Sequence, residues 1–177
     1  VSGTGAKAVN ELVHQTGQIL AGEAPDIQVY PHQIAFNCLP HIDVFLDSGS
    51  TKEEQKMVDE TKKIMGDPSI AVTATCVRVP VLRCHSESVN VEFTAPVAVE
   101  AARAALAVAP GVTLLDDPAA REYPMPGLLE GTDDCYVGRL RADTSVAHGL
   151  QLWIVADQLR KGAALNTVQI AEALLRR

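Results

Sequence analysis

The segment 149–156, GLQLWIVA, constrains the fold most, because it is apolar at nearly every position. A strand of this kind is buried on both faces and lies in the centre of a sheet. Other strands are predicted at 135–140, just before it, and at 89–93, where Val and Phe alternate with polar residues. Successive strands without a helix between them form an antiparallel or mixed sheet. The sequence therefore predicts an α+β fold, with helices on one face of a mixed, largely antiparallel sheet.

The remaining elements follow from periodicity and from end signals. Helices are predicted at 4–21, 51–66, 97–108 and 160–176, and strands at 70–79 and 112–115. The second helix has the clearest limits, because Thr51 and Glu54 are spaced as a capping box and Gly66 follows. No repeat and no linker composition divides the chain, so residues 1–177 are expected to form a single domain.

Composition narrows the class of partner. The chain has 177 residues, a formal charge of −7 and a pI near 5.2, which argue against nucleic acid and anionic membranes as partners. Small molecules and a second copy of the chain fit better. No apolar run approaches the roughly 20 residues of a membrane span, and the first residues do not resemble a signal peptide, so a cytoplasmic protein is expected. The first residue is Val rather than Met, which suggests an excised part of a longer protein.

Cysteines and histidines give no metal signature. The four cysteines form no C-x-x-C pair, and the five histidines have no H-x-x-x-H spacing. We therefore expect no metal, and reduced, mostly buried thiols.

The stretch RVPVLRCHSESV, residues 78–89, contains the best candidate for an acid or base. His85 is either a polar residue at the start of a strand or a working imidazole, whose ordinary pKa of about 6.5 suits proton transfer. Arg78 lies seven residues earlier, beyond Pro80, and a guanidinium grips a carboxylate with two hydrogen bonds. If the chain folds back at Pro80, a fixed cation and an imidazole share one pocket.

Two other stretches have two interpretations each. Glu53 and Lys56, one turn apart at the start of the second helix, form either an exposed ion pair or a site for an amine and an anion. The small residues in DQLRKGAALN, 157–166, permit the close approach of a flat ligand or of another helix.

Seven blocks of the sequence together carry a family resemblance. They are VSGTGA (1–6), HQIAFNCLPHIDVF (32–45), TKEEQKMVDETKKIMGDP (51–68), TCVRVPVLRCHSESVNVEF (75–93), YPMP (123–126), YVGRLRAD (136–143) and LWIVADQLRKGAALNTVQIAE (152–172). The chain resembles the C-terminal, substrate-binding and dimerisation domain of aspartate-β-semialdehyde dehydrogenase, which has a glyceraldehyde-3-phosphate-dehydrogenase-like fold. The resemblance extends over nearly the whole chain.

The resemblance implies the NADP-dependent conversion of aspartate semialdehyde and phosphate to aspartyl-β-phosphate, in the biosynthesis of lysine, methionine, threonine and isoleucine. His85 matches the general acid and base that activates a cysteine nucleophile. Arg78 matches the arginine that binds the substrate carboxylate. Glu53 matches the carboxylate that contacts the substrate amine, and Lys56 the lysine that binds phosphate.

The resemblance also implies cofactor contacts and a partner. Ser2 and Gly3 match small residues near the NADP, and Gln158 matches the residue that approaches the nicotinamide. A homodimer through the sheet of this domain is expected. The thiolate of the family attacks the aldehyde, a hydride passes to NADP⁺, and phosphate breaks the thioester.

The chain lacks parts that the family carries before the matched region. The nucleotide-binding domain, the nucleophilic cysteine and a substrate-positioning glutamine of the family precede the part that this chain matches. We expect Cys38 to be a packing residue, and Cys84 to point to the sheet face opposite His85. The chain alone is therefore expected to be inactive, with NADP bound mainly by the missing domain.

Two alternatives remain open at this point. One is a non-catalytic dimerising module that binds phosphate or an amino acid. The other is a sister acyl-phosphate reductase, such as N-acetylglutamyl-phosphate reductase, against which the spacing of Glu53, Lys56, Arg78 and His85 argues.

Overall fold

The computed structural model describes residues 1–176, which form two compact units. The first unit runs from Val1 to Leu82, and the second begins at Arg83. Within residues 1–176, no helix is both long enough and apolar enough to cross a membrane.

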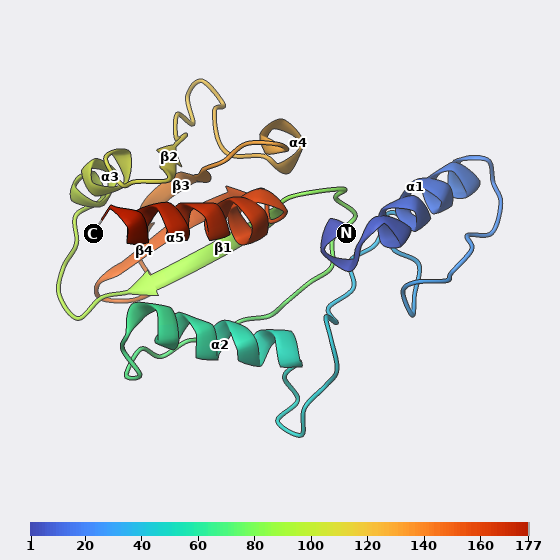
Figure 1. Ribbon diagram of the computed structural model, residues 1–177, viewed down its shortest axis with the longest axis horizontal. Helices are drawn as coiled ribbons and strands as arrows, with labels where there is room; N and C mark the ends of the chain where they lie inside the picture. The colour runs from blue at the N-terminus through green and yellow to red at the C-terminus, as the bar shows by residue number, and fades with distance from the viewer. Residues whose placement is uncertain (177) are drawn as a thin grey trace. The chain divides into compact units, whose positions relative to one another are not determined.

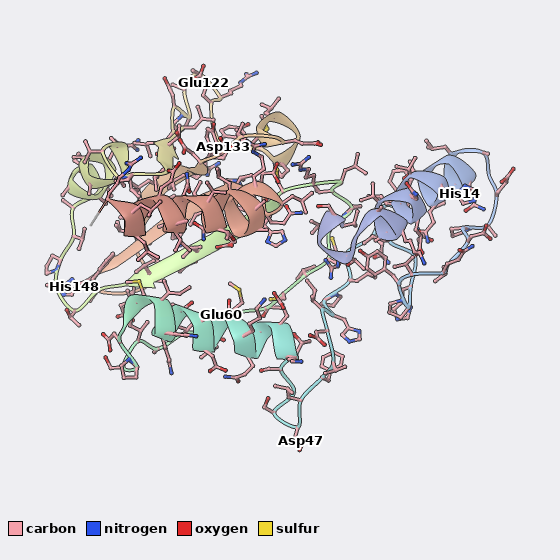
Figure 2. The ribbon with its side chains drawn as sticks, in the orientation of Figure 1. His14, Asp47, Glu60, Glu122, Asp133 and His148 are labelled. Carbon is pink, nitrogen blue, oxygen red and sulfur yellow. The ribbon has the colours of Figure 1, made fainter. Side chains whose placement is uncertain are left out.

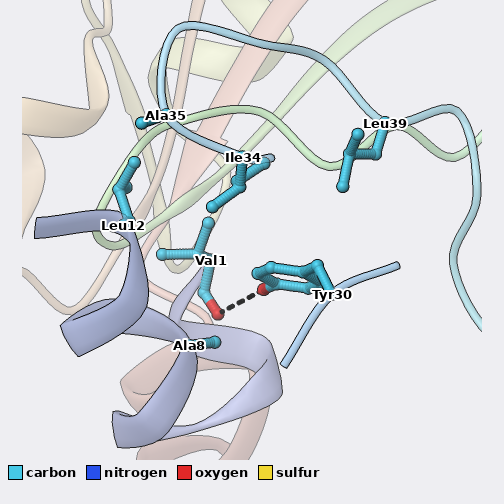
Figure 3. Packing of buried hydrophobic residues seen from close by; sticks show 7 residues of the cluster. All are labelled: Val1, Ala8, Leu12, Tyr30, Ile34, Ala35 and Leu39. Atoms are coloured by element: carbon cyan, nitrogen blue, oxygen red, sulfur yellow. Dashed lines mark hydrogen bonds between the residues drawn. The ribbon is translucent and has the colours of Figure 1, made fainter. Parts of the chain in front are cut away.

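The first unit packs a loop against one helix. Its 3-10 helix η1 and its helices α1 and α2 span Ser2–Thr4, Ala6–Leu20 and Lys52–Met65. Ala8 and Leu12 lie one turn apart on α1 and pack against Tyr30 and Ile34 of the following loop. Figure 3 shows this core, in which the Tyr30 hydroxyl donates to the Val1 carbonyl oxygen at 3.4 Å. Helix and loop thus share one apolar cluster.

A buried glutamine attaches this loop to α1 by hydrogen bonds. Gln15 is fully buried, and its amide nitrogen donates to the carbonyl oxygen of Asp26 at 2.7 Å. Its amide oxygen accepts the backbone N–H groups of Ile34 at 2.9 Å and Ala35 at 3.1 Å. The loop is therefore held by directional contacts as well as by apolar packing.

Helix α2 begins and ends where the sequence predicts. Thr51 accepts the backbone N–H of Glu54 at 3.3 Å, and the Glu54 carboxylate accepts the N–H of Thr51 at 2.8 Å. The helix ends at Gly66, which has φ of 67° in the left-handed region that glycine adopts without strain. The predicted capping box is confirmed.

The strand predicted at 70–79 is wrong. In the structure this segment forms no strand, and its one ladder contact is an isolated bridge between Arg78 and Leu39. The burial of its side chains does alternate, with Val72, Ala74, Cys76 and Arg78 more buried than their neighbours. The pattern that suggested a strand is thus real, but a strand also needs a hydrogen-bonded neighbour, which alternation does not supply.

The second unit is built on a four-stranded sheet, shown in Figure 1. Its strands β1, β2, β3 and β4 span His85–Glu92, Val112–Leu114, Cys135–Asp143 and Gly149–Ala156, in the spatial order β1-β4-β3-β2. β4 pairs antiparallel with both β1 and β3, and β2 pairs parallel with β3. The apolar segment 149–156 is therefore a central strand, and the predicted α+β class with a mixed, largely antiparallel sheet is confirmed.

Helices and an apolar cluster complete the second unit. The helices α3, α4 and α5 span Val99–Ala107, Pro126–Leu129 and Leu165–Leu175, and a π-helical turn, η2, spans Arg160–Ala164. α3 lies against β2 and β3, and α4 against β4. Leu129 of α4 is buried with Cys84 and Val155, on the sheet face that also carries Trp153. The short helix α4 is not among the predicted elements, since four residues are too few for a periodic pattern.

Candidate functional site

In the first unit, the opening turn of α2 carries the predicted amine and anion ligands. The Lys56 ammonium nitrogen lies 3.7 Å from a Glu53 carboxylate oxygen, and both side chains are partly exposed. The capping box at Thr51 and Glu54 fixes the turn from which they project. An exposed pair of this kind contributes little to stability, so both groups are free to exchange their contact for a ligand.

The segment that leads to Arg78 is bonded to this turn. The backbone N–H of Cys76, two residues before Arg78, donates to the Glu54 carboxylate at 2.9 Å. The Arg78 guanidinium carbon lies 5.6 Å from the centre of the Tyr30 ring, and its backbone pairs with Leu39. Glu53, Lys56 and Arg78 therefore lie in one unit, and the chain just before Arg78 is bonded to Glu54.

The guanidinium of Arg78 retains unused hydrogen-bonding capacity. Its Nε is buried and has no hydrogen-bond partner in the structure. Buried donors of a charged group are normally satisfied, and an orphan of this kind calls for a partner such as a carboxylate. The unpartnered Nε is the observation that makes Arg78 a candidate for binding an anionic ligand.

The two candidate cofactor residues of the first unit lie in η1. Ser2 donates its backbone N–H to the carbonyl oxygen of Leu82 at 3.1 Å, which joins the start of the unit to its end. Gly3 is exposed, and Thr4 beside it accepts a hydrogen bond from the Tyr30 hydroxyl at 3.0 Å. Small residues on such a turn leave room for a ligand to approach the backbone.

In the second unit, His85 and Gln158 lie at one end of the sheet. His85 is the exposed first residue of β1 and is directly opposite Ala156, the last residue of β4. Gln158 follows two residues after Ala156. His85 shares its sheet face with Val89 and Val91, as the sequence predicts.

Sequence reasoning missed two residues at this end of the sheet. Asp157, between Ala156 and Gln158, is fully buried and forms an ion pair with Arg83. A carboxylate directly after a central apolar strand was the available signal, because such a charge stays buried only when it is paired. The polar turn 157–166 was instead assigned to ligand or helix approach.

The cysteines differ in exposure. Cys38 is exposed, so the expectation that it packs in the interior is wrong. Cys84 is buried with Leu129 and Val155, on the face opposite that of His85, as expected. Burial raises the pKa of both Cys84 and Cys135, which keeps these thiols protonated and weakly nucleophilic.

Nowhere in residues 1–176 do three or more His, Cys, Asp or Glu side chains gather as a metal site would require. The groups available to a ligand are instead a guanidinium, an ammonium, a carboxylate, an imidazole and an amide. Within the first unit, the guanidinium, the ammonium and the carboxylate are groups that could bind a ligand with anionic and amine groups.

Comparison with known families gives an extended match. Residues 1–161 match the family described as the semialdehyde dehydrogenase dimerisation domain. Aspartate-semialdehyde dehydrogenase of Aquifex aeolicus is 54% identical over 99% of this chain, which covers 52% of the relative. That of Legionella pneumophila is 57% identical over 99% of the chain and 51% of the relative. The chain thus spans about half the length of these relatives.

Solved structures agree with the fold. Aspartate semialdehyde dehydrogenase II of Vibrio cholerae superimposes with a TM-score of 0.95, at 47% identity, over 99% of this chain and 52% of that one. A second structure of that enzyme, complexed with ASA, gives a TM-score of 0.94 over the same shares of the two chains.

Proposed function

We propose, because this chain belongs to the semialdehyde dehydrogenase dimerisation-domain family, that it is the substrate-binding and dimerisation part of an aspartate-semialdehyde dehydrogenase. The complete enzyme would convert aspartate semialdehyde, phosphate and NADP⁺ to aspartyl-β-phosphate and NADPH. Identity above 50% over almost the whole chain to two enzymes of that name supports this proposal. This sequence identity favours neither of the two alternatives, the non-catalytic module and the N-acetylglutamyl-phosphate reductase.

The observation that carries the proposal is the surroundings of Arg78. Arg78 has a buried Nε without a hydrogen-bond partner, and the chain two residues before it is bonded to Glu54, in the turn that presents the Glu53 carboxylate and the Lys56 ammonium group. In this proposal Arg78 binds the substrate carboxylate, Glu53 its ammonium group and Lys56 the phosphate. Two cations and one anion complement a substrate that carries two anions and one amine.

His85 has the role of proton carrier in this proposal. Its imidazole takes the proton of the attacking thiol, which the remainder of the enzyme supplies, and returns it to the reacting oxygen or to the leaving thiol. When bound, NADP⁺ would supply the hydride acceptor for this reaction. Ser2, Gly3 and Gln158 contribute contacts to that cofactor, most of which the remainder of the enzyme makes.

The proposal includes an assembly. The two compact units act as one substrate-binding and dimerisation domain, and two copies associate through the sheet of the second unit. The name of the family supports the dimer. Because burial raises the pKa of Cys84, the cysteine next to His85 in the sequence, we expect this chain to be inactive alone.

The test is NADP⁺ reduction with aspartate semialdehyde and phosphate. It compares the 177-residue chain with the parent enzyme, meaning the longer protein in which this chain forms the second half. We expect the chain to be silent and the parent enzyme to be active. His85→Ala should lower the kcat of the parent enzyme by roughly 10²- to 10⁴-fold, which is typical of losing a general base.

The matched control is His14→Ala. His14 is exposed on α1, where Figure 2 labels it, and its imidazole lies 3.4 Å from the Asp26 carboxylate. This variant should keep the full kcat. Arg78→Ala should raise KM for aspartate semialdehyde, and Lys56→Ala should raise KM for phosphate. Turnover by the 177-residue chain on its own would contradict the proposal and would make Cys38 and Cys84 the residues to mutate. Equal activity of His85→Ala and His14→Ala would also contradict the proposal.

A further inference from the structure

An arginine–aspartate pair with a fully buried carboxylate lies at the end of the sheet that carries His85 and Gln158. Asp157 is fully buried, and Arg83 contacts it through two nitrogens. Arg83 Nε donates to Oδ1 of Asp157 at 3.1 Å, and Nη2 lies 2.7 Å from Oδ2. Such a fork of two contacts fixes the relative orientation of the two groups, which a single hydrogen bond does not.

The same carboxylate also collects backbone donors. It accepts the N–H of Gly131 at 2.8 Å and the N–H of Leu159 at 3.0 Å. Burial raises the pKa of Asp157, but the hydrogen bonds from Arg83 and from these two amides outweigh it and hold the pKa below its ordinary value. The charged Asp157 carboxylate thus joins three segments: the chain before β1, the loop after α4 and the turn after β4.

The turn after β4 is anchored a second time. Arg160, at the start of η2, forms an ion pair with Asp133, which Figure 2 labels near α4 and β3. Gln158 therefore lies between two anchored residues, Asp157 and Arg160. Its backbone has little freedom as long as both ion pairs persist.

The chain before β1 is strained at one position. Cys84, between Arg83 and His85, has φ of 75°, in the left-handed region that side chains other than glycine rarely adopt. A residue keeps such a conformation only where its surroundings hold it. Here Arg83 is held by Asp157, and the Cys84 side chain is held by its burial with Leu129 and Val155. Release of Arg83 lets this strain relax, and the next residue is His85.

We propose that Asp157 and Arg83 are positioning residues, whose forked contact sets the orientation of His85 and Gln158 at the shared end of β1 and β4. The expected loss of kcat rests on the roles given to His85 and Gln158 in the proposed function. The expected change in the orientation of His85 does not. Neither Asp157 nor Arg83 touches the substrate in this inference.

The test is Asp157→Asn, which keeps the shape of the side chain and removes its charge. We expect the ring resonances of His85 in the nitrogen–proton spectrum of the 177-residue chain to broaden or to split, with their assignment taken from His85→Gln. In the parent enzyme we expect kcat to fall by about 10- to 100-fold, since a misplacement of about 1 Å has an effect of that size. KM for phosphate should stay within about twofold.

Asp116→Asn is the matched control. Asp116 is also buried and also paired with an arginine, Arg103, at 2.7 Å, and it also accepts two backbone N–H groups, those of Arg139 and Leu140. It should lower the melting temperature as Asp157→Asn does, yet leave kcat and the His85 signals unchanged. A merely structural role for Asp157 would make the two variants alike, and that result overturns the inference.

Two outcomes separate this inference from the proposed function. Activity that survives His85→Ala would rule out the catalytic role of His85. The His85 resonances of Asp157→Asn, compared with those of the native sequence, would still test whether the Arg83–Asp157 pair positions His85. If Asp157→Asn does not fold, Arg83→Gln replaces it, because the Arg83 side chain is 27% exposed and its loss leaves a polar group in place. Unchanged His85 signals in Arg83→Gln would also overturn the inference.

Discussion

Replacement of Gln15 should lower the stability of the first unit strongly. It is fully buried on α1, and its side chain makes four hydrogen bonds. Its amide nitrogen donates to Glu11 at 3.1 Å and to the carbonyl oxygen of Asp26, and its amide oxygen accepts the N–H groups of Ile34 and Ala35. Replacement by alanine removes all four contacts at once.

The magnitude follows from the groups left behind. Two buried backbone N–H groups lose their acceptor, and each unsatisfied buried donor costs about 1–3 kcal/mol. The free energy of unfolding should therefore fall by roughly 2–6 kcal/mol, less where water enters the space. A domain of this size has about 5–15 kcal/mol in total, so Gln15→Ala is expected to place the unit near its limit of stability.

Hydrogen exchange measures this effect locally. In Gln15→Ala we expect the amides of Ile34 and Ala35 to lose their protection, together with a lower urea midpoint by circular dichroism. Tyr30 lies in the same loop and under the Arg78 guanidinium, so KM for aspartate semialdehyde in the parent enzyme should rise as well. The control is Gln18→Ala, one turn on, whose single exposed hydrogen bond is to the N–H of Asp26 at 2.9 Å.

Two results would refute this reasoning. One is a Gln15→Ala variant no less stable than Gln18→Ala, which would mean that water or a shift of the loop satisfies the freed groups at no cost. The other is lost protection at Ile34 and Ala35 with an unchanged KM, which would separate the loop from the placement of Arg78.

Two further predictions concern acid stability and thiol reactivity. Hydrogen bonds from Ser145 and Asn90 hold the pKa of Asp143 below its ordinary value, so its stabilising effect is complete above about pH 4 and is lost as the pH falls further. The melting temperature should therefore drop more steeply between about pH 4 and pH 2 in the native sequence than in Asp143→Asn, and parallel curves would contradict this. Cys38 is exposed, whereas Cys84 is 8% exposed and has a pKa raised by burial, so a thiol reagent should label Cys38 much faster. Peptide mapping by mass spectrometry measures both rates, and equal labelling would show that Cys84 is not held in the core.

Much of the fold could be predicted because its signals are local. The capping box of Thr51 and Glu54, Gly66 at the end of α2 and the apolar strand 149–156 are all read from neighbours in sequence, and each is confirmed. The strand at 70–79 failed because pairing is a property of two segments, and alternation in one segment cannot provide the other. The helix α4 was missed because four residues are too few for a periodic pattern, and the exposure of Cys38 was missed because exposure depends on what packs nearby.

The candidate site divides in the same way. His85, Arg78, Glu53 and Lys56 could be proposed from sequence, because residue type and spacing indicate chemistry and because the blocks around them resemble a family. Their roles remain predictions.

The Arg83–Asp157 pair could not be proposed from sequence. Its two members are 74 residues apart and meet only because β1 and β4 are paired. Sequence by itself determined the local elements, the fold class and the family, since these depend on short-range patterns and on residue types. Tertiary structure decided which charges are paired in the interior and where Arg78 keeps an unused donor, because these depend on contacts between distant segments.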